Sequence, residues 1–176
     1  MGPIDRTLRR GYASAAVLLA VLAWPAEGWS RARTCPTRAQ IARLFDHRNE
    51  MLQKSARERK PEYVVSTYTT DAILLPTCTT SGPLVGHDDI TKYFAEFIKK
   101  HPVGKIDESR ISIAPGCNIA FDTGLYTFEV NGDPLDVRVP LQARYTFIYR
   151  RQDNGRLIAQ QHSSVRRQSD AACLPK

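Results

Sequence analysis

Several common signatures of catalysis are missing from this chain of 176 residues. It has no Gly-rich phosphate loop, no Gly-x-Ser-x-Gly nucleophile motif and no catalytic-loop or metal-binding motif of a protein kinase. Its four cysteines match neither a zinc-binding nor a Cys-x-x-Cys spacing. Internal repeats and low-complexity tracts are absent as well. We therefore predict neither a cofactor nor a metal.

Concentrated positive charge is also missing, although the chain is basic, with a net charge of +7 and a pI of about 9.4. The basic residues fall in separate groups, at 57–60, 99–100, 150–151 and 166–167. Nucleic-acid-binding proteins usually gather such charge on one face, with aromatic residues between. We expect a solvated basic surface and no nucleic-acid partner.

No apolar run reaches the roughly 20 residues that a membrane-spanning helix needs. The run at 13–24 is shorter, follows three arginines between residues 6 and 10, and precedes the small residues Ala26 and Gly28. This order is typical of a secretory signal peptide, cleaved after Gly28 or Ser30. We predict a signal peptide at 1–30 and a secreted or periplasmic protein without a stable membrane span. An uncleaved anchor is the alternative.

The remaining residues, 31–176, have the length and composition of a single domain, with its core at 37–165. Export would allow disulfides. The four cysteines allow three full pairings, which the sequence does not rank; they are Cys35, Cys78, Cys117 and Cys173. We expect Cys35 and Cys173 to take part in pinning the two ends of the domain, and buried thiols are the alternative.

Helical spacing marks two main segments. Thr37 and Gln40 form a capping box before apolar residues that recur to about Lys54. A second helix opens at Asp88 and ends in basic residues before Pro102. A charged link and a short helix at 61–68 lie between them. One strand pattern, at 72–77, lies between the short helix and the second main helix. Four more follow that helix, at 105–114, 118–130, 137–150 and 156–165. This order predicts an α+β fold, with helices on one face of a curved antiparallel sheet.

The two last strands form a long hairpin with clear period-two alternation. Residues Val137 to Tyr149 place apolar side chains on one face, and Arg144 lies on the other. The return strand ends at His162, and we expect it on the same face as Arg144. If that face closes a cavity, Arg144 would grip a ligand carboxylate and His162 would act as general base or hydrogen-bond donor.

Other roles for these two residues stay open. Arg144 could form an internal salt bridge with Asp122, Glu129 or Asp71, or it could be exposed. His162 could be a structural residue bonded to a neighbouring hydroxyl, that of Tyr126 or Ser164.

Three more side chains are candidates for the same pocket. Tyr68 and Tyr126 could line its wall, and Asp122 could serve as a catalytic base together with His162 if the protein is an enzyme. His87 stands next to two aspartates at a helix start, where capping is a better interpretation than metal binding.

Six phrases, taken in order, resemble the bacterial SgcJ/EcaC group of the nuclear transport factor two-like (SnoaL-like) superfamily, and they are similar to the association (hub) domain of calcium/calmodulin-dependent protein kinase II. The resemblance covers roughly Thr37 to Val165. The phrases are Leu44–Asp46, Tyr68–Thr77, Gly86–Phe94, Gly116–Asn118 with Asp122–Phe128, Ala143–Phe147 and His162–Ser164.

The resemblance implies a cone-shaped, cystatin-like fold in which a curved antiparallel sheet wraps a long N-terminal helix. It also implies dimers or larger rings, and a pocket lined by Arg and His that accepts small carboxylates. His162 and Arg144 match that pattern, whereas Ser163 stands where the hub has a further arginine.

Three functions are therefore considered. The first is an exported homodimer or larger homo-oligomer that binds a small polar or anionic ligand through Arg144, His162, Tyr126 and Tyr68. The second is a cofactor-independent isomerase, cyclase or dehydratase that uses the same pocket. The third is a purely structural oligomerisation hub.

Overall fold

The computed structural model describes residues 34–77, 82–132, 137–153 and 155–166. The predicted signal peptide, and with it the predicted domain boundary, lie outside these residues. The helices are α1 (Arg38–Glu58), α2 (Glu62–Val65), α3 (Gly86–Phe97) and the 3-10 helix η1 (Ile98–Lys100). The strands are β1 (Tyr68–Leu75), β2 (Leu84–Val85), β3 (Val103–Ile113), β4 (Ile119–Asn131), β5 (Arg138–Gln152) and β6 (Gly155–Val165).

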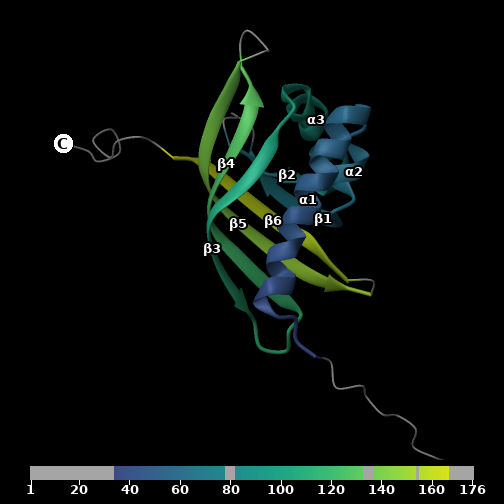
Figure 1. Cartoon of the computed structure of the whole chain (residues 1–176). Coiled ribbons are helices and arrows are strands. Elements are labelled where there is room, and N and C mark those ends of the chain that lie inside the picture. The colour runs from purple at the N-terminus through teal and green to yellow at the C-terminus, as the bar shows by residue number, and fades with distance from the viewer. Residues whose placement is uncertain (1–33, 78–81, 133–136, 154, 167–176) are drawn as a thin grey trace, which may run out of the picture. The chain divides into compact units, whose positions relative to one another are not determined.

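The six strands form one curved sheet in the order β2-β1-β6-β5-β4-β3 (Figure 1). Strands β3 to β6 are the predicted antiparallel meander, with ends within a few residues of the prediction. Strand β1 adds a parallel pair with β6, which the sequence did not predict. The α+β class is confirmed, and the sheet is mostly rather than wholly antiparallel.

Helix α1 begins with the predicted capping box, in which Thr37 and Gln40 bond reciprocally. It runs to Glu58 and not to Lys54, so the predicted charged link begins too early. The reason is Ser55, which is fully buried and whose hydroxyl accepts a hydrogen bond from the backbone of Val64 in the next helical turn. A partner for that hydroxyl allows the helix to continue past a residue of modest helix propensity.

Helices α1, α2 and α3 lie on the concave side of the sheet (Figure 1). On that side β5 presents Tyr145, Phe147 and Tyr149, each at most 3% exposed. Their rings contact one another at centroid distances of 5.2 and 5.8 Å, and Phe45 of α1 packs on Phe147 at 6.0 Å. Burial of these large aromatic groups dominates the energy of this layer. It fixes which face of the hairpin points inward.

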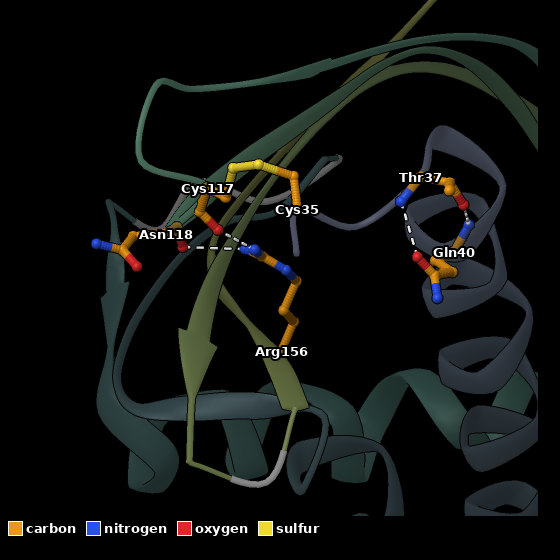
Figure 2. Close-up of a disulfide and its surroundings, with 6 residues drawn as sticks. All are labelled: Cys35, Thr37, Gln40, Cys117, Asn118 and Arg156. Carbon is orange, nitrogen blue, oxygen red and sulfur yellow. Dashed lines mark hydrogen bonds between the residues drawn. A yellow bond between two sulfur atoms is a disulfide. The ribbon is translucent and has the colours of Figure 1, made fainter. Parts of the chain in front are cut away.

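A disulfide joins Cys35, just before α1, to Cys117 in the turn between β3 and β4 (Figure 2). The guanidinium of Arg156 donates to the backbone carbonyls of Cys117 and Asn118, at 3.0 Å for Asn118. The bridge spans 82 residues, and bridges of this kind contribute about 2–4 kcal/mol. Cys35 therefore does pin one end of the domain, whereas Cys78 and Cys173 lie outside the described residues.

Three described residues other than glycine have a left-handed backbone: Arg59 at the end of α1, His101 at the end of η1, and Cys117 of the disulfide. A side chain in this conformation costs roughly 1–2 kcal/mol. At Cys117 the disulfide holds the turn. The other two residues lie together on the helical side of the domain, and no covalent bond holds them.

Candidate functional site

Arg144 and His162 do share a face of the hairpin, because Thr146 of β5 pairs with His162 and lies two residues from Arg144. That face is the outer one, and both side chains are exposed. The expectation that they face an enclosed interior is therefore wrong. The period-two pattern fixes which residues share a face, and the aromatic row of Tyr145 and its neighbours decides which face is buried. Neither residue can line an internal pocket of one protomer.

The three companions predicted beside them do point inward. Tyr68, Tyr126 and Asp122 are buried, at most 3% exposed. Asp122 and His162 therefore lie on opposite faces of the sheet, so they cannot work as a catalytic pair. The hydroxyl of Tyr126, one of the two partners considered for a structural His162, instead forms a hydrogen bond with the inward-facing hydroxyl of Ser163.

The buried cation of this protein is Arg48, in the middle of α1, with 2% of its surface exposed. Its Nε donates to the hydroxyl of Tyr68 at 3.1 Å, and its Nη2 donates to Oε1 of Gln161 at 3.3 Å. The Tyr68 hydroxyl also donates to Gln161. The guanidinium lies 5.5 Å from the ring centres of Phe94 and Phe147, within the range of a cation–π contact.

Arg48 has no acidic partner among the residues that the structure describes. Within the described residues its Nη1 is buried without any hydrogen-bond acceptor, and the hydroxyl of Tyr149 is buried without a hydrogen-bond partner. A guanidinium stays charged in proteins, and burying one without an anion is costly. The aromatic faces and two neutral acceptors offset only part of this cost. Arg48 thus lacks a neutralising anion in direct contact among the described residues.

Burial raises the pKa of Tyr68, although Arg48 beside it acts in the opposite direction. Burial also raises the pKa of Tyr149 well above its usual value, and Asp122 adds to that effect while Arg48 opposes it. The tyrosines around Arg48 are therefore neutral phenols at pH 7. They donate and accept hydrogen bonds but do not neutralise the guanidinium.

A second polar cluster surrounds the carboxyl of Asp122 on β4. Ser109 and Tyr145 both donate to its Oδ1, at 2.6 and 3.0 Å. Burial raises the pKa of Asp122, and these two hydrogen bonds only partly oppose the effect. No cation contacts this carboxyl among the described residues.

A groove of about 440 Å³ opens between α3 and the ends of β4 and β5. We call it the aromatic groove; it is lined by Thr77, Tyr93, Glu96, Phe97, Lys100, Val130 and Leu141. The rings of Tyr93 and Phe97 are stacked 5.8 Å apart on its wall. Behind Phe97 lies Phe128, at 5.8 Å, and behind that Tyr126, at 4.9 Å.

The same groove connects to the buried cation through one ring. Tyr93 contacts Phe94 at 5.1 Å, and Phe94 packs on the guanidinium of Arg48. The guanidinium of Arg48, which is bonded to Gln161, therefore lies one ring deeper than the groove wall. The volume is typical of small-molecule sites.

Sequence reasoning missed Arg48 as a candidate functional residue. The signal was present, since it occupies a position of the apolar helical pattern between Phe45 and Leu52, where a cation is out of place. Among the described residues no group of three His, Cys, Asp or Glu side chains is placed to hold a metal. In the same residues, no helix has both the length and the apolar character of a membrane span.

A curved sheet on a long N-terminal helix, with a groove at one end, defines an α+β domain of the nuclear transport factor two-like, cystatin-like class. The solved structures bear this out. A Xanthomonas campestris protein assigned to the calcium/calmodulin-dependent protein kinase II association domain is 31% identical, with a TM-score of 0.68, covering 77% of this chain and 94% of its own. The chain belongs to the family of that protein, within the nuclear transport factor two-like class.

More distant structures share the fold alone. A nuclear transport factor two-like protein of Novosphingobium aromaticivorans is 10% identical, with a TM-score of 0.59, covering 77% of this chain and 85% of its own. A ketosteroid isomerase-like protein of Erwinia carotovora is 16% identical, with a TM-score of 0.53, covering 73% of this chain and 98% of its own. No family model and no curated protein matches the sequence.

Proposed function

We propose that this protein is an exported, self-associating domain that binds a small organic molecule with a polar or anionic end. The ligand's apolar body lies in the aromatic groove against Tyr93 and Phe97. Its charged end points toward Arg48, which takes the role of anchor that the sequence suggested for Arg144.

One observation carries this proposal: the buried guanidinium of Arg48 lacks an acid among the described residues, and its Nη1 lacks any acceptor there. A carboxylate is the natural complement, because it accepts two parallel hydrogen bonds from a guanidinium. To reach it, a ligand has to displace the ring of Phe94, which separates the groove from the cation. That movement requires repacking of a buried ring, because Phe94 is 1% exposed and contacts Tyr68, Tyr93 and Phe97.

The outer face of the sheet supports self-association as a homodimer. Phe121 and Ile148 pair across β4 and β5, and Leu125 lies beside Arg144 in another outward pair. All three apolar side chains are only partly buried within one protomer. The related Xanthomonas protein is assigned to an association domain, which fits an assembly role for this face.

Export is supported by the disulfide between Cys35 and Cys117, since such bonds persist in oxidising compartments. The N-terminal apolar run agrees with it. We therefore place the mature domain in the periplasm or outside the cell.

A second candidate function is cofactor-independent proton transfer with Asp122 as the base. It is favoured by the buried carboxyl of Asp122 and its raised pKa, properties that suit a general base. His162 has no part in it. Asp122 does not line the aromatic groove, so a binding role for that groove is the better-supported function.

The test is a thermal-shift comparison of phenylacetate with phenylacetamide, which has the same body without the charge. At a concentration of about ten times its dissociation constant, phenylacetate should raise the melting temperature of the protein by roughly 3 °C. Phenylacetamide at the same concentration should not. Arg48→Gln should abolish the difference. Arg43→Gln is the matched control, because Arg43 lies on the exposed side of the same helix.

Equal effects of the two compounds, or equal losses in the two variants, would rule out Arg48 as the anchor. Native mass spectrometry of protein purified from its own compartment adds an independent readout. It should show a dimer with a retained small molecule. A ligand-free oligomer would contradict ligand binding and leave the purely structural oligomerisation hub as the remaining function.

A further inference from the structure

A second cavity lies on the helical side of the domain, between the end of α1 and the segment formed by α3 and η1. Its volume is about 390 Å³. We call it the cationic cavity; it is lined by Ala56, Arg59, Pro61, Ala95, Ile98, Lys99 and His101. The floor is apolar, since Ala56 and Ile98 are buried. The rim carries three basic side chains.

We propose that the cationic cavity is a separate binding site for an organic phosphate with an apolar body, such as an aryl or alkyl phosphate. It uses none of the residues that form the aromatic groove. The two sites lie on different sides of one helical segment, with Ala95, Ile98 and Lys99 facing the cavity and Tyr93 and Phe97 facing the groove.

The rim has more positive than negative charge. Lys99 donates to both carboxylate oxygens of Glu96, at 2.6 and 2.8 Å. Within the described part of the chain, the side chains of Arg59 and His101 form no ion pair and no hydrogen bond. Arg59 therefore brings an uncompensated charge to the rim, and His101 brings a further donor. An anion at this position satisfies both.

The backbone at these two rim residues is unusual. Arg59 has φ 56° and His101 has φ 45°, so both are left-handed positions at helix ends, where glycine or asparagine is preferred. Two bulky side chains at such positions lower stability for no gain within the fold. A local rule that is broken without a local benefit often marks a functional position.

Attraction between cations and helix C-termini is the simpler explanation of the charges. It accounts for their sign, but any basic residue of the last turn would provide it, and Lys99 already does so for η1. It does not require side chains at the two left-handed positions. His101 is moreover held in place, because Arg138 of β5 donates to its carbonyl at 2.9 Å. This hydrogen bond fixes the backbone of His101 at the rim.

The experiment is a titration of the full mature protein with phenyl phosphate, followed by methyl NMR. Phenol has the same body without the charge, and inorganic phosphate has the charge without the body. Phenyl phosphate should shift the methyl signals of Ala56, Ala95 and Ile98 in a saturable way, and the two comparison compounds should shift them far less. Shifts confined to Val130 and Leu141 would place the compound in the aromatic groove and overturn the proposal.

Arg59→Gly separates binding from stability. It removes the charge but relieves the left-handed backbone, so we expect a melting temperature about 3 °C higher together with an affinity at least tenfold lower. Lys92→Gln, on the outer side of α3, should change neither, since the one ion pair of Lys92 among the described residues is with Asp89. An Arg59→Gly protein that keeps its affinity, or an equal loss in Lys92→Gln, would overturn the proposal.

These results do not depend on the aromatic groove. Arg59→Gly should leave the phenylacetate response of the Val130 and Leu141 methyl groups unchanged. Arg48→Gln should abolish the phenylacetate response and leave the binding of phenyl phosphate intact. Either proposal can therefore be refuted without the other.

Discussion

The inner and outer faces of the β5–β6 hairpin differ in what they do with charge. The inner face carries Tyr145, Phe147 and Gln161, and the cation that it surrounds comes from α1. The outer face carries its own cation, Arg144, in contact with water. Arg48 is thus a helix residue whose side chain is buried, whereas Arg144 is a strand residue whose side chain is exposed. The comparison teaches that the buried cation of this domain is supplied from a helix across the core and not by the sheet itself.

The physical basis of this difference is the cost of desolvation. An arginine on a strand extends perpendicular to the sheet, and turning it inward would have exposed the aromatic row beside it. An arginine on α1 replaces only one apolar position, and its guanidinium lies against the rings of Phe94, Phe147 and Tyr68. The helix can therefore bury a cation at a lower cost than the hairpin can.

The largest difference in the free energy of unfolding is expected between the alanine variants of Arg48 and Arg144. Arg48→Ala leaves a void and removes the partner of Tyr68 and Gln161, and it should lower the free energy of unfolding by about 3–5 kcal/mol. Arg144→Ala should change it by less than about 0.5 kcal/mol. Urea denaturation monitored by fluorescence measures both. Similar losses in the two variants would show that the two arginines do not differ in this way.

Much of the fold could be predicted from the sequence, because its signals are local. The capping box at Thr37, the acidic start of α3 and the alternation of β5 each depend on neighbouring residues. The parallel pairing of β1 with β6 could not be predicted, since it joins Leu74 to Gln161 across most of the domain. Strand β2 has only two residues, too few for any periodicity.

The site was harder to predict for a different reason. Tyr68, Tyr126 and Asp122, predicted as pocket residues, are buried, but none of them lines the aromatic groove. The predicted side of Arg144 was wrong, although the aromatic residues on the opposite face of β5, Tyr145, Phe147 and Tyr149, were a local signal of which face is buried. The role of Arg48 depends on rings from α3 and β5, and Arg59 meets His101 only where two helices end side by side. These side chains come together only in the folded domain, so local sequence patterns do not reveal their contacts.

A smaller effect is expected from a charge placed on the outer face. Ile148→Asp should raise the dissociation constant of the proposed homodimer by at least tenfold, because a carboxylate would have to be desolvated in the interface. The variant should remain folded, since Ile148 is only partly buried. Analytical ultracentrifugation measures the change. Lys105→Asp is the control on the exposed edge strand β3 and should leave the dimer intact.

The smallest effects should appear in the pH dependence of two aspartates, one buried and one exposed. The buried Asp122 has a raised pKa, so its contribution to stability is present below the unfolded pKa and is lost as the pH rises through the folded pKa. The exposed Asp71 accepts a hydrogen bond from Arg150 that lowers its pKa to about 2. Its contribution is present above the unfolded pKa and is lost as the pH falls through about 2.

The two asparagine variants should therefore diverge from the parent protein in opposite directions. As the pH rises from about 2 toward 7, Asp122→Asn should gain stability relative to the parent, because it avoids ionising a buried group. Asp71→Asn should lose stability relative to the parent over the same range, because it lacks the charge that Arg150 contacts. Thermal unfolding of the three proteins along one pH series measures both slopes. Slopes of the same sign would mean that the interior around Asp122 is as well solvated as the surface around Asp71, and the contrast between buried and exposed charge would not hold for carboxylates.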